Sequence, residues 1–156
     1  MNDIKSFAVA LFVLIGLPTI ASACPDYSAY GAEYSYTGDQ LYQPRSFSVI
    51  AGGSNNLRNC PVREDGYVTT PPDFTFSLRD MGNYRLEIEV ESDCDAILLV
   101  NSADGSWFYD DDSRGNLDPV INLRGSWHLD GYVDVWVGTF DGEYCDATLE
   151  IETWDN

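Results

Sequence analysis

Apolar and polar residues alternate along much of the chain, which is the pattern of strands with one buried face. In residues 84–91, Tyr, Leu, Ile and Val occupy the even positions and Arg or Glu the odd ones. Residues 96–100 (AILLV) are all apolar instead, which predicts a strand covered on both faces. The predicted strands are residues 47–50, 74–78, 84–91, 96–100, 120–123, 132–140 and 147–154.

Turn-forming residues separate these strands. They include Gly-Gly-Ser-Asn-Asn at 52–56, Pro-Pro-Asp at 71–73 and Asp-Gly at 141–142. Short strands with frequent turns, and no helical period after Pro18, predict an all-β fold, an antiparallel β-sandwich. Residues 25–42, rich in Tyr, Gly, Ser and Asp, are expected to be irregular, with room for one edge strand.

The first 23 residues have the three parts of a cleavable signal peptide. Lys5 is followed by the apolar run 7–17, by Pro18, and by Ala21 and Ala23 at the −3 and −1 positions of a cleavage site. The run is too short for a membrane span, which takes about 20 apolar residues. We therefore expect a bacterial protein that is periplasmic or secreted, with one mature domain over residues 24–156 and no separate catalytic domain.

The charge of the chain excludes several partners. The formal net charge is −18 at pH 7. After removal of residues 1–23, seven basic residues remain, all Arg, against 25 acidic ones. Such a chain repels nucleic acids and anionic membranes. The acidity fits either solubility outside the cell or the binding of cations, and the sequence leaves both interpretations open.

Four cysteines, Cys24, Cys60, Cys94 and Cys145, remain in the mature chain. An even number in an exported protein predicts two disulfides. Of the three possible pairings, we favour Cys24–Cys60 with Cys94–Cys145, in which the closed loops do not overlap. The alternative for Cys24 is a lipid anchor, but Ala21 stands where lipidation normally requires Leu, and Cys60 would be left unpaired.

The segment 104–118 is the most distinctive in the chain because it is rich in oxygen ligands. Calcium takes six to eight such ligands, so the segment is a candidate calcium site, with calcium as the candidate cofactor. The segment is not an EF-hand, because Arg114 and Ile121 occupy ligand positions of that motif. The alternative is an acidic turn whose Asp side chains cap their own backbone. The candidate ligands are Asp104, Asp110, Asp111, Asp112, Asn116 and Asp118.

Catalytic chemistry has little support in the sequence, and no catalytic residue is predicted. His128 is the single histidine, and no Ser lies in a nucleophile motif. We therefore expect His128 to be a residue of a surface turn. A pair of carboxylates that hydrolyses glycosides is the alternative, but 25 acidic residues point to no particular pair.

Aromatic residues suggest a further class of ligand. Trp107, Tyr109 and Trp127 are candidates for a flat platform that binds sugar rings, since Asp and Asn lie near them. The alternative is that these rings cover the core of the sandwich and its edges.

The order of these features resembles a known family. An Asp-Phe strand start at 73–74, Cys-Asp-Ala-Ile-Leu-Leu-Val at 94–100, Asp-Gly at 104–105 and Asp-Asp-Asp-Ser at 110–113 are followed by two last strands. Over about residues 73–153, the chain resembles the bacterial pre-peptidase C-terminal (PPC) domain family and, within it, small secreted proteins of proteobacteria. The resemblance implies a jelly-roll-like β-sandwich. Such domains usually accompany secreted hydrolases as non-catalytic modules, and some bind calcium or polymeric substrates.

Together these observations predict an exported, non-catalytic β-sandwich that binds a protein or a glycan of the cell envelope, with calcium steadying the segment 104–118. Two alternatives remain open. One is a carbohydrate-binding module, and the other is a small secreted hydrolase associated with peptidases.

Overall fold

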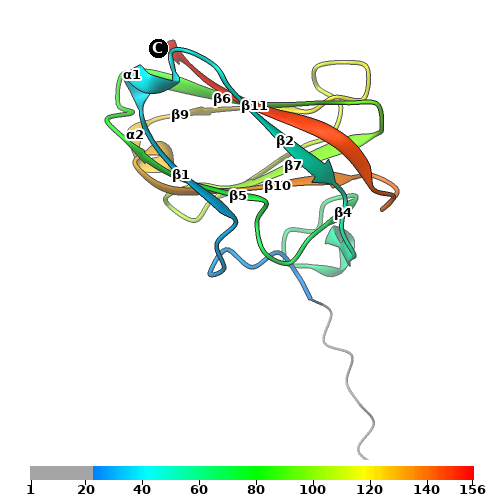
Figure 1. Cartoon of the computed structure of the whole chain (residues 1–156). Coiled ribbons are helices and arrows are strands. Elements are labelled where there is room, and N and C mark those ends of the chain that lie inside the picture. The colour runs from blue at the N-terminus through cyan, green and yellow to red at the C-terminus, as the bar shows by residue number, and fades with distance from the viewer. Residues whose placement is uncertain (1–22) are drawn as a thin grey trace, which may run out of the picture.

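Two β-sheets pack face to face in the computed structural model, which describes residues 23–156 (Figure 1). The predicted signal peptide therefore lies outside the described residues, apart from Ala23. Sheet A contains β1 (Ala32–Thr37), β5 (Phe74–Arg79), β10 (Gly131–Thr139), β7 (Ala96–Asn101), β8 (Trp107–Asp110), β4 (Tyr67–Val68) and β3 (Asn55–Asn56). Sheet B contains, in order, β2 (Arg45–Ala51), β11 (Cys145–Asp155), β6 (Tyr84–Ser92) and β9 (Val120–Arg124). The short helices are α1 (Gly38–Leu41), α2 (Ser126–Leu129) and the 3-10 turn η1 (Leu57–Asn59).

The prediction of an all-β sandwich is confirmed, and all seven predicted strands are present. The expected edge strand in the N-terminal region is β1, which runs parallel to β5 and makes sheet A mixed rather than antiparallel. Strands β3, β4 and β8 were not predicted. The first two contain only two residues each, and β8 lies inside the segment whose composition suggests an acidic loop.

The main core lies between the two sheets and follows from the alternation in the sequence. On β6, Leu86, Ile88 and Val90 are buried and face the core, as do Leu149 and Ile151 on β11. Full burial of one such side chain stabilises the fold by about 1.5–3 kcal/mol. The polar residues between them are left on the outer face of sheet B.

Sheet A has a second apolar layer on its outer face, which explains why β7 is buried on both sides. Leu57 on η1 and Val68 on β4 pack there against Ile97, Leu99 and Trp136. We call residues 55–68, which contain β3, η1 and β4, the lobe. Figure 1 shows it beneath sheet A. The wholly apolar run of β7 therefore faces two cores, as its sequence predicts.

Both disulfides have the predicted pairing. Cys24–Cys60 ties the start of the described chain to the lobe, and Cys94–Cys145 joins the segment before β7 of sheet A to the first residue of β11 in sheet B. The Cys24 sulfur that a lipid would modify is thus part of a disulfide. Within residues 23–156, none of the helices has the length and apolar character that crossing a membrane requires.

Gly138 allows the lobe to approach sheet A closely. A Cβ at this position would collide with the backbone carbonyl oxygen of Tyr67 on β4. We predict that Gly138→Ala lowers the free energy of unfolding by about 2 kcal/mol, as expected for overpacking. Gly82→Ala is the control, since its Cβ would enter open space. Equal stabilities of the two variants in urea unfolding would contradict the prediction.

Asp73 makes the stability of the fold depend on pH. Burial raises the pKa of its carboxyl to about 6, although the carboxylate accepts a hydrogen bond from the Val137 N–H at 2.8 Å. The raised pKa means that the folded state favours the protonated carboxyl, so the fold is more stable when Asp73 is neutral than when it is ionised. This stabilisation is complete below the ordinary pKa near 4 and is lost as the pH rises through 6. We expect a slope on the order of 1 kcal/mol per pH unit between about pH 4 and 6. Urea unfolding of Asp73→Asn should lack this component, and superimposable pH profiles would refute it.

Candidate functional site

Two acidic residues of the predicted calcium segment, Asp110 and Asp118, bind backbone groups of the segment itself, of β9 and of β6. The Asp110 carboxylate accepts hydrogen bonds from the Ser113 hydroxyl and N–H, and from the Val120 N–H at 2.7 Å. The Asp118 carboxylate accepts one from the Ser92 N–H at 3.1 Å. These contacts are those of an acidic turn that caps backbone groups.

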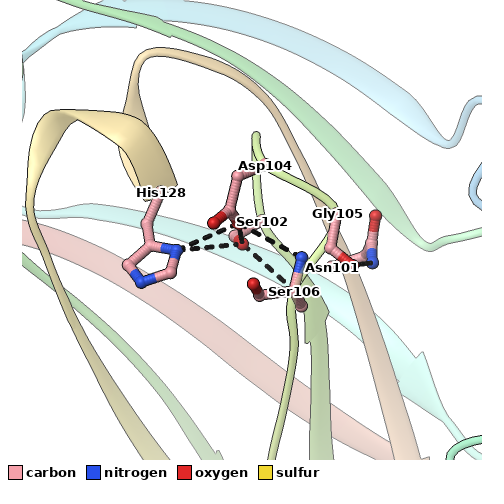
Figure 2. A network of polar contacts seen from close by, with 6 residues as sticks. All are labelled: Asn101, Ser102, Asp104, Gly105, Ser106 and His128. Atoms are coloured by element: carbon pink, nitrogen blue, oxygen red, sulfur yellow. Dashed lines mark hydrogen bonds and ion pairs between the residues drawn. The ribbon is translucent and has the colours of Figure 1, made fainter.

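The remaining candidate ligands take different places, and among them Asp111 directly follows the last residue of β8. Asp104 lies on the turn after β7, with partners of its own (Figure 2). The carbonyl of Asp112 accepts a hydrogen bond from the Gly115 N–H, and Asn116 has a positive φ of 58°. Within residues 23–156, no group of three or more His, Cys, Asp or Glu side chains is suited to hold a metal ion. Calcium binding is not tested by this arrangement and stays a prediction.

His128 and Asp104 join α2 to the turn between β7 and β8. Figure 2 shows the His128 ring facing the carboxylate of Asp104 and the hydroxyl of Ser102. The distance from Nδ1 to Asp104 Oδ1 is 3.0 Å, and Ser102 Oγ donates to the same oxygen at 2.6 Å. The hydrogen bond from Ser102, followed by that from His128, holds the pKa of Asp104 well below its usual range. The Ala103 N–H also donates to the His128 carbonyl at 2.9 Å, so the network fastens α2 to the turn.

The three side chains of this network do not have the geometry of a hydrolytic triad. In such a triad the serine and the acid lie on opposite nitrogens of the imidazole. Here both contact Nδ1, with Ser102 Oγ at 3.5 Å and Asp104 Oδ1 at 3.0 Å. Ser102 is also buried, so its hydroxyl is not presented to a substrate. The network is suited to holding the turn in place.

The three aromatic candidates do not form a single platform. Trp107 and Tyr109 lie on the outer side of β8 and pack against the second apolar layer, with Trp107 at 5.4 Å from the ring of Trp136. The Tyr109 hydroxyl is buried without a hydrogen-bond partner among the described residues, and burial raises the pKa of this phenol. Trp127 is 66% exposed on α2, where its ring lies beside His128. Carbohydrate binding by these residues stays a prediction.

The outer face of sheet B, by contrast, carries mostly negatively charged side chains. Side chains on this face alternate with the buried ones on β6 and β11. The antiparallel register places Glu89 directly opposite Glu150, and Glu87 directly opposite Glu152. We call this surface the acidic face. Its carboxylates are Glu87, Glu89, Glu91, Asp146, Glu150 and Glu152, and its guanidinium groups are Arg85 and Arg124.

Like charges on directly opposed residues destabilise a sheet. Burial raises the pKa of the Glu152 carboxyl, and the like charges of Glu150 and Glu87 raise it further. Local cations offset part of the repulsion: Arg114 forms an ion pair with Glu89, and Arg85 lies 3.8 Å from Glu87. The acidic face nevertheless retains more carboxylates than nearby guanidinium groups.

Apart from the loop 111–119, whose Arg114 forms an ion pair with Glu89, no described element covers the acidic face. In Figure 1 the lobe and the N-terminal segment lie on the side of sheet A, whereas the yellow loop before β9 rises on the outer side of sheet B. An open depression of about 740 Å³ lies at one end of this face. Its lining includes three carboxylates, Glu91, Asp93 and Asp146, beside Ile50.

The acidic face was not predicted from the sequence, although half of its signal is visible there. The alternation in 84–91 shows Glu residues on the wet side of one strand, and Glu150 and Glu152 alternate likewise in 147–154. What the alternation does not show is that β6 and β11 are neighbours in register. The acidic face arises from that pairing.

Comparisons with known protein families and with curated proteins give no match to this chain. Among solved structures, it is similar to the crystal structure of PliG from Aeromonas hydrophila, a periplasmic inhibitor of g-type lysozyme. The two share 10% sequence identity, with a TM-score of 0.46 over 81% of this chain and 99% of that chain. No functional conclusion follows from a likeness at this level.

The calcium prediction can be tested by thermal unfolding of residues 24–156. If the segment 104–118 binds calcium, a concentration of 100 times Kd should stabilise the protein by about 2.7 kcal/mol and raise the Tm. The Asp111→Asn/Asp112→Asn variant should lose this increase, and magnesium at the same concentration is the control for general screening. An unchanged Tm at millimolar calcium would refute the prediction.

Proposed function

We propose that this protein is an exported, non-catalytic binding module whose acidic face binds a positively charged protein. The observation that carries the proposal is the register of β6 and β11, which sets Glu87 opposite Glu152 and Glu89 opposite Glu150. This arrangement costs stability in the free protein. A partner that brings Lys and Arg side chains to the face relieves the repulsion on binding.

The shape of the face favours a protein over a small ligand. It spans four neighbouring strands, has no covering element among residues 23–156 apart from the loop 111–119, and its larger depression is open. Small-molecule sites are enclosed and mostly apolar. A broad, charged surface is typical of a protein partner of opposite charge, for which complementary potentials speed association and select the partner.

The polar network of Ser102, Asp104 and His128 supports the non-catalytic part of the proposal. The Ser102 hydroxyl is buried, and Ser102 and Asp104 both contact the same nitrogen, Nδ1, of His128. The two disulfides support export, because disulfides persist in oxidising compartments such as the bacterial periplasm.

The proposal predicts that a basic protein binds and that neutralising the acidic face weakens binding. The triple variant Glu89→Gln/Glu150→Gln/Glu152→Gln should raise Kd about tenfold, since each exposed ion pair contributes about 0.5 kcal/mol. The probes are a c-type lysozyme, a g-type lysozyme and cytochrome c, with serum albumin as the acidic control. Binding is measured by interferometry at two salt concentrations.

The matched control changes the same number of charges elsewhere. Glu33, Glu64 and Glu143 are exposed and lie off the acidic face, so their triple change to Gln should raise Kd less than twofold. The face variant should also have the higher Tm, because the repulsion between opposed glutamates is removed. Absence of binding by every basic probe, or equal weakening by both variants, would refute the proposal.

A further inference from the structure

Strand β2 forms one edge of sheet B and has an unpaired side. It pairs with β11 from Arg45 to Ala51 along its whole length, and no second strand pairs with it among residues 23–156. Natural edge strands are usually protected by Lys, Pro, a bulge or a covering segment. From Ser46 to Ala51, β2 contains neither a Pro nor a charged residue. Its free backbone groups are therefore available to a further strand.

The surface beside this edge is apolar on the side of the core. Phe47 and Val49 are only partly buried, although they pack against the main core. The ring of Tyr34, on the edge strand of sheet A, lies 4.6 Å from that of Phe47 and is 36% exposed. The seam between the two sheets is thus incompletely covered along β2. A strand beside β2 would cover it with every second side chain.

The surface beside the same edge is acidic on the other side. The Ser46 hydroxyl donates to Glu150 Oε2 at 2.8 Å, which directs this carboxylate towards β2. Further along, the depression beside Ser48 and Ile50 is lined by Glu91, Asp93 and Asp146. The alternate side chains of a strand added to β2 would point towards these carboxylates.

We infer that an extended segment of the basic partner adds to β2 as a fifth strand of sheet B. Its residues alternate between apolar side chains, which cover the seam at Tyr34 and Phe47, and Lys or Arg side chains, which pair with Glu150 and the acidic depression. This is strand addition, in which backbone hydrogen bonds supply affinity and alternate side chains supply specificity. The inference rests on the proposed function, because the partner is the same basic protein.

Charge argues against a second copy of the chain at this edge. Two copies joined through β2 would place two acidic faces side by side, each on a chain of net charge −18. Such a pairing repels, whereas a basic segment is attracted.

The probe is a synthetic nine-residue peptide in which Lys and Val alternate. Amide hydrogen exchange followed by NMR should show that β2 amides on the free edge exchange at least tenfold more slowly with peptide bound. Amides of β9, the opposite edge of sheet B, should keep their exchange rates. The control is the same peptide with every backbone amide N-methylated, which keeps side chains and charge but removes the N–H donors, and it should bind at least tenfold more weakly.

A single-charge variant tests the side-chain part. Glu150→Gln should raise the Kd of the peptide about threefold, as expected for one exposed ion pair, whereas Glu33→Gln, with the same change in net charge, should leave it within 1.5-fold. Unchanged β2 exchange rates in the complex, or equal binding of the N-methylated peptide, would overturn the inference. Those results would leave the proposed function standing if basic proteins still bind the acidic face. Failure of every basic protein to bind would refute the proposed function itself.

Discussion

The pairing of β11 with two neighbours determines most of this structure. This strand runs from Cys145 to Asp155 between β2 and β6, with seven registered residue pairs on one side and nine on the other. Its inward residues, among them Leu149 and Ile151, close the main core from the side of sheet B. The same register aligns the outward glutamates of β11 with those of β6, so the buried and charged faces are consequences of one alignment. A slip by one residue would exchange the two faces.

The register is retained against its electrostatic cost because burial contributes more free energy than the repulsion removes. Each apolar side chain that β11 or β6 buries contributes about 1.5–3 kcal/mol, whereas an exposed charge pair contributes at most about 1 kcal/mol of either sign. The opposed pairs of Glu87 with Glu152 and Glu89 with Glu150 are therefore tolerated. Because the fold does not depend on the sign of these charges, the outward positions of β6 and β11 are free to carry the charges that binding a partner requires.

The sequence was a good guide to individual strands and a poor one to their neighbours. Alternation in 84–91 and 147–154 predicted β6 and β11 and their wet sides, and the wholly apolar run at 96–100 predicted a doubly covered strand. Alternation is a local property, however, and which strands pair is decided by the packing of the whole chain. The acidic face needed both, so only half of it was predictable.

Two further differences between prediction and structure have the same origin. Strand β8 was not predicted because Asp residues flank Trp107–Asp110, yet its aromatic residues alternate across sheet A. The parallel pairing of β1 with β5 brings Tyr34 beside Phe47 and Phe76, residues far apart in the chain. Neither strand β8 nor the pairing of β1 with β5 can be recognised from the local sequence.

The two sheets use their outer faces differently, and this asymmetry identifies the free surface. Sheet A covers its outer face with the lobe around Leu57 and Val68, which is tied to the N-terminal segment by Cys24–Cys60. Trp107 and Tyr109, two of the residues that the sequence suggested as a sugar platform, pack against that layer. Sheet B has no such apolar layer in the described part of the chain, although the loop 111–119 reaches its polar side through Arg114, and that side is charged rather than neutral. The chain thus concentrates apolar side chains where it binds itself and carboxylates on the face that we propose binds a partner.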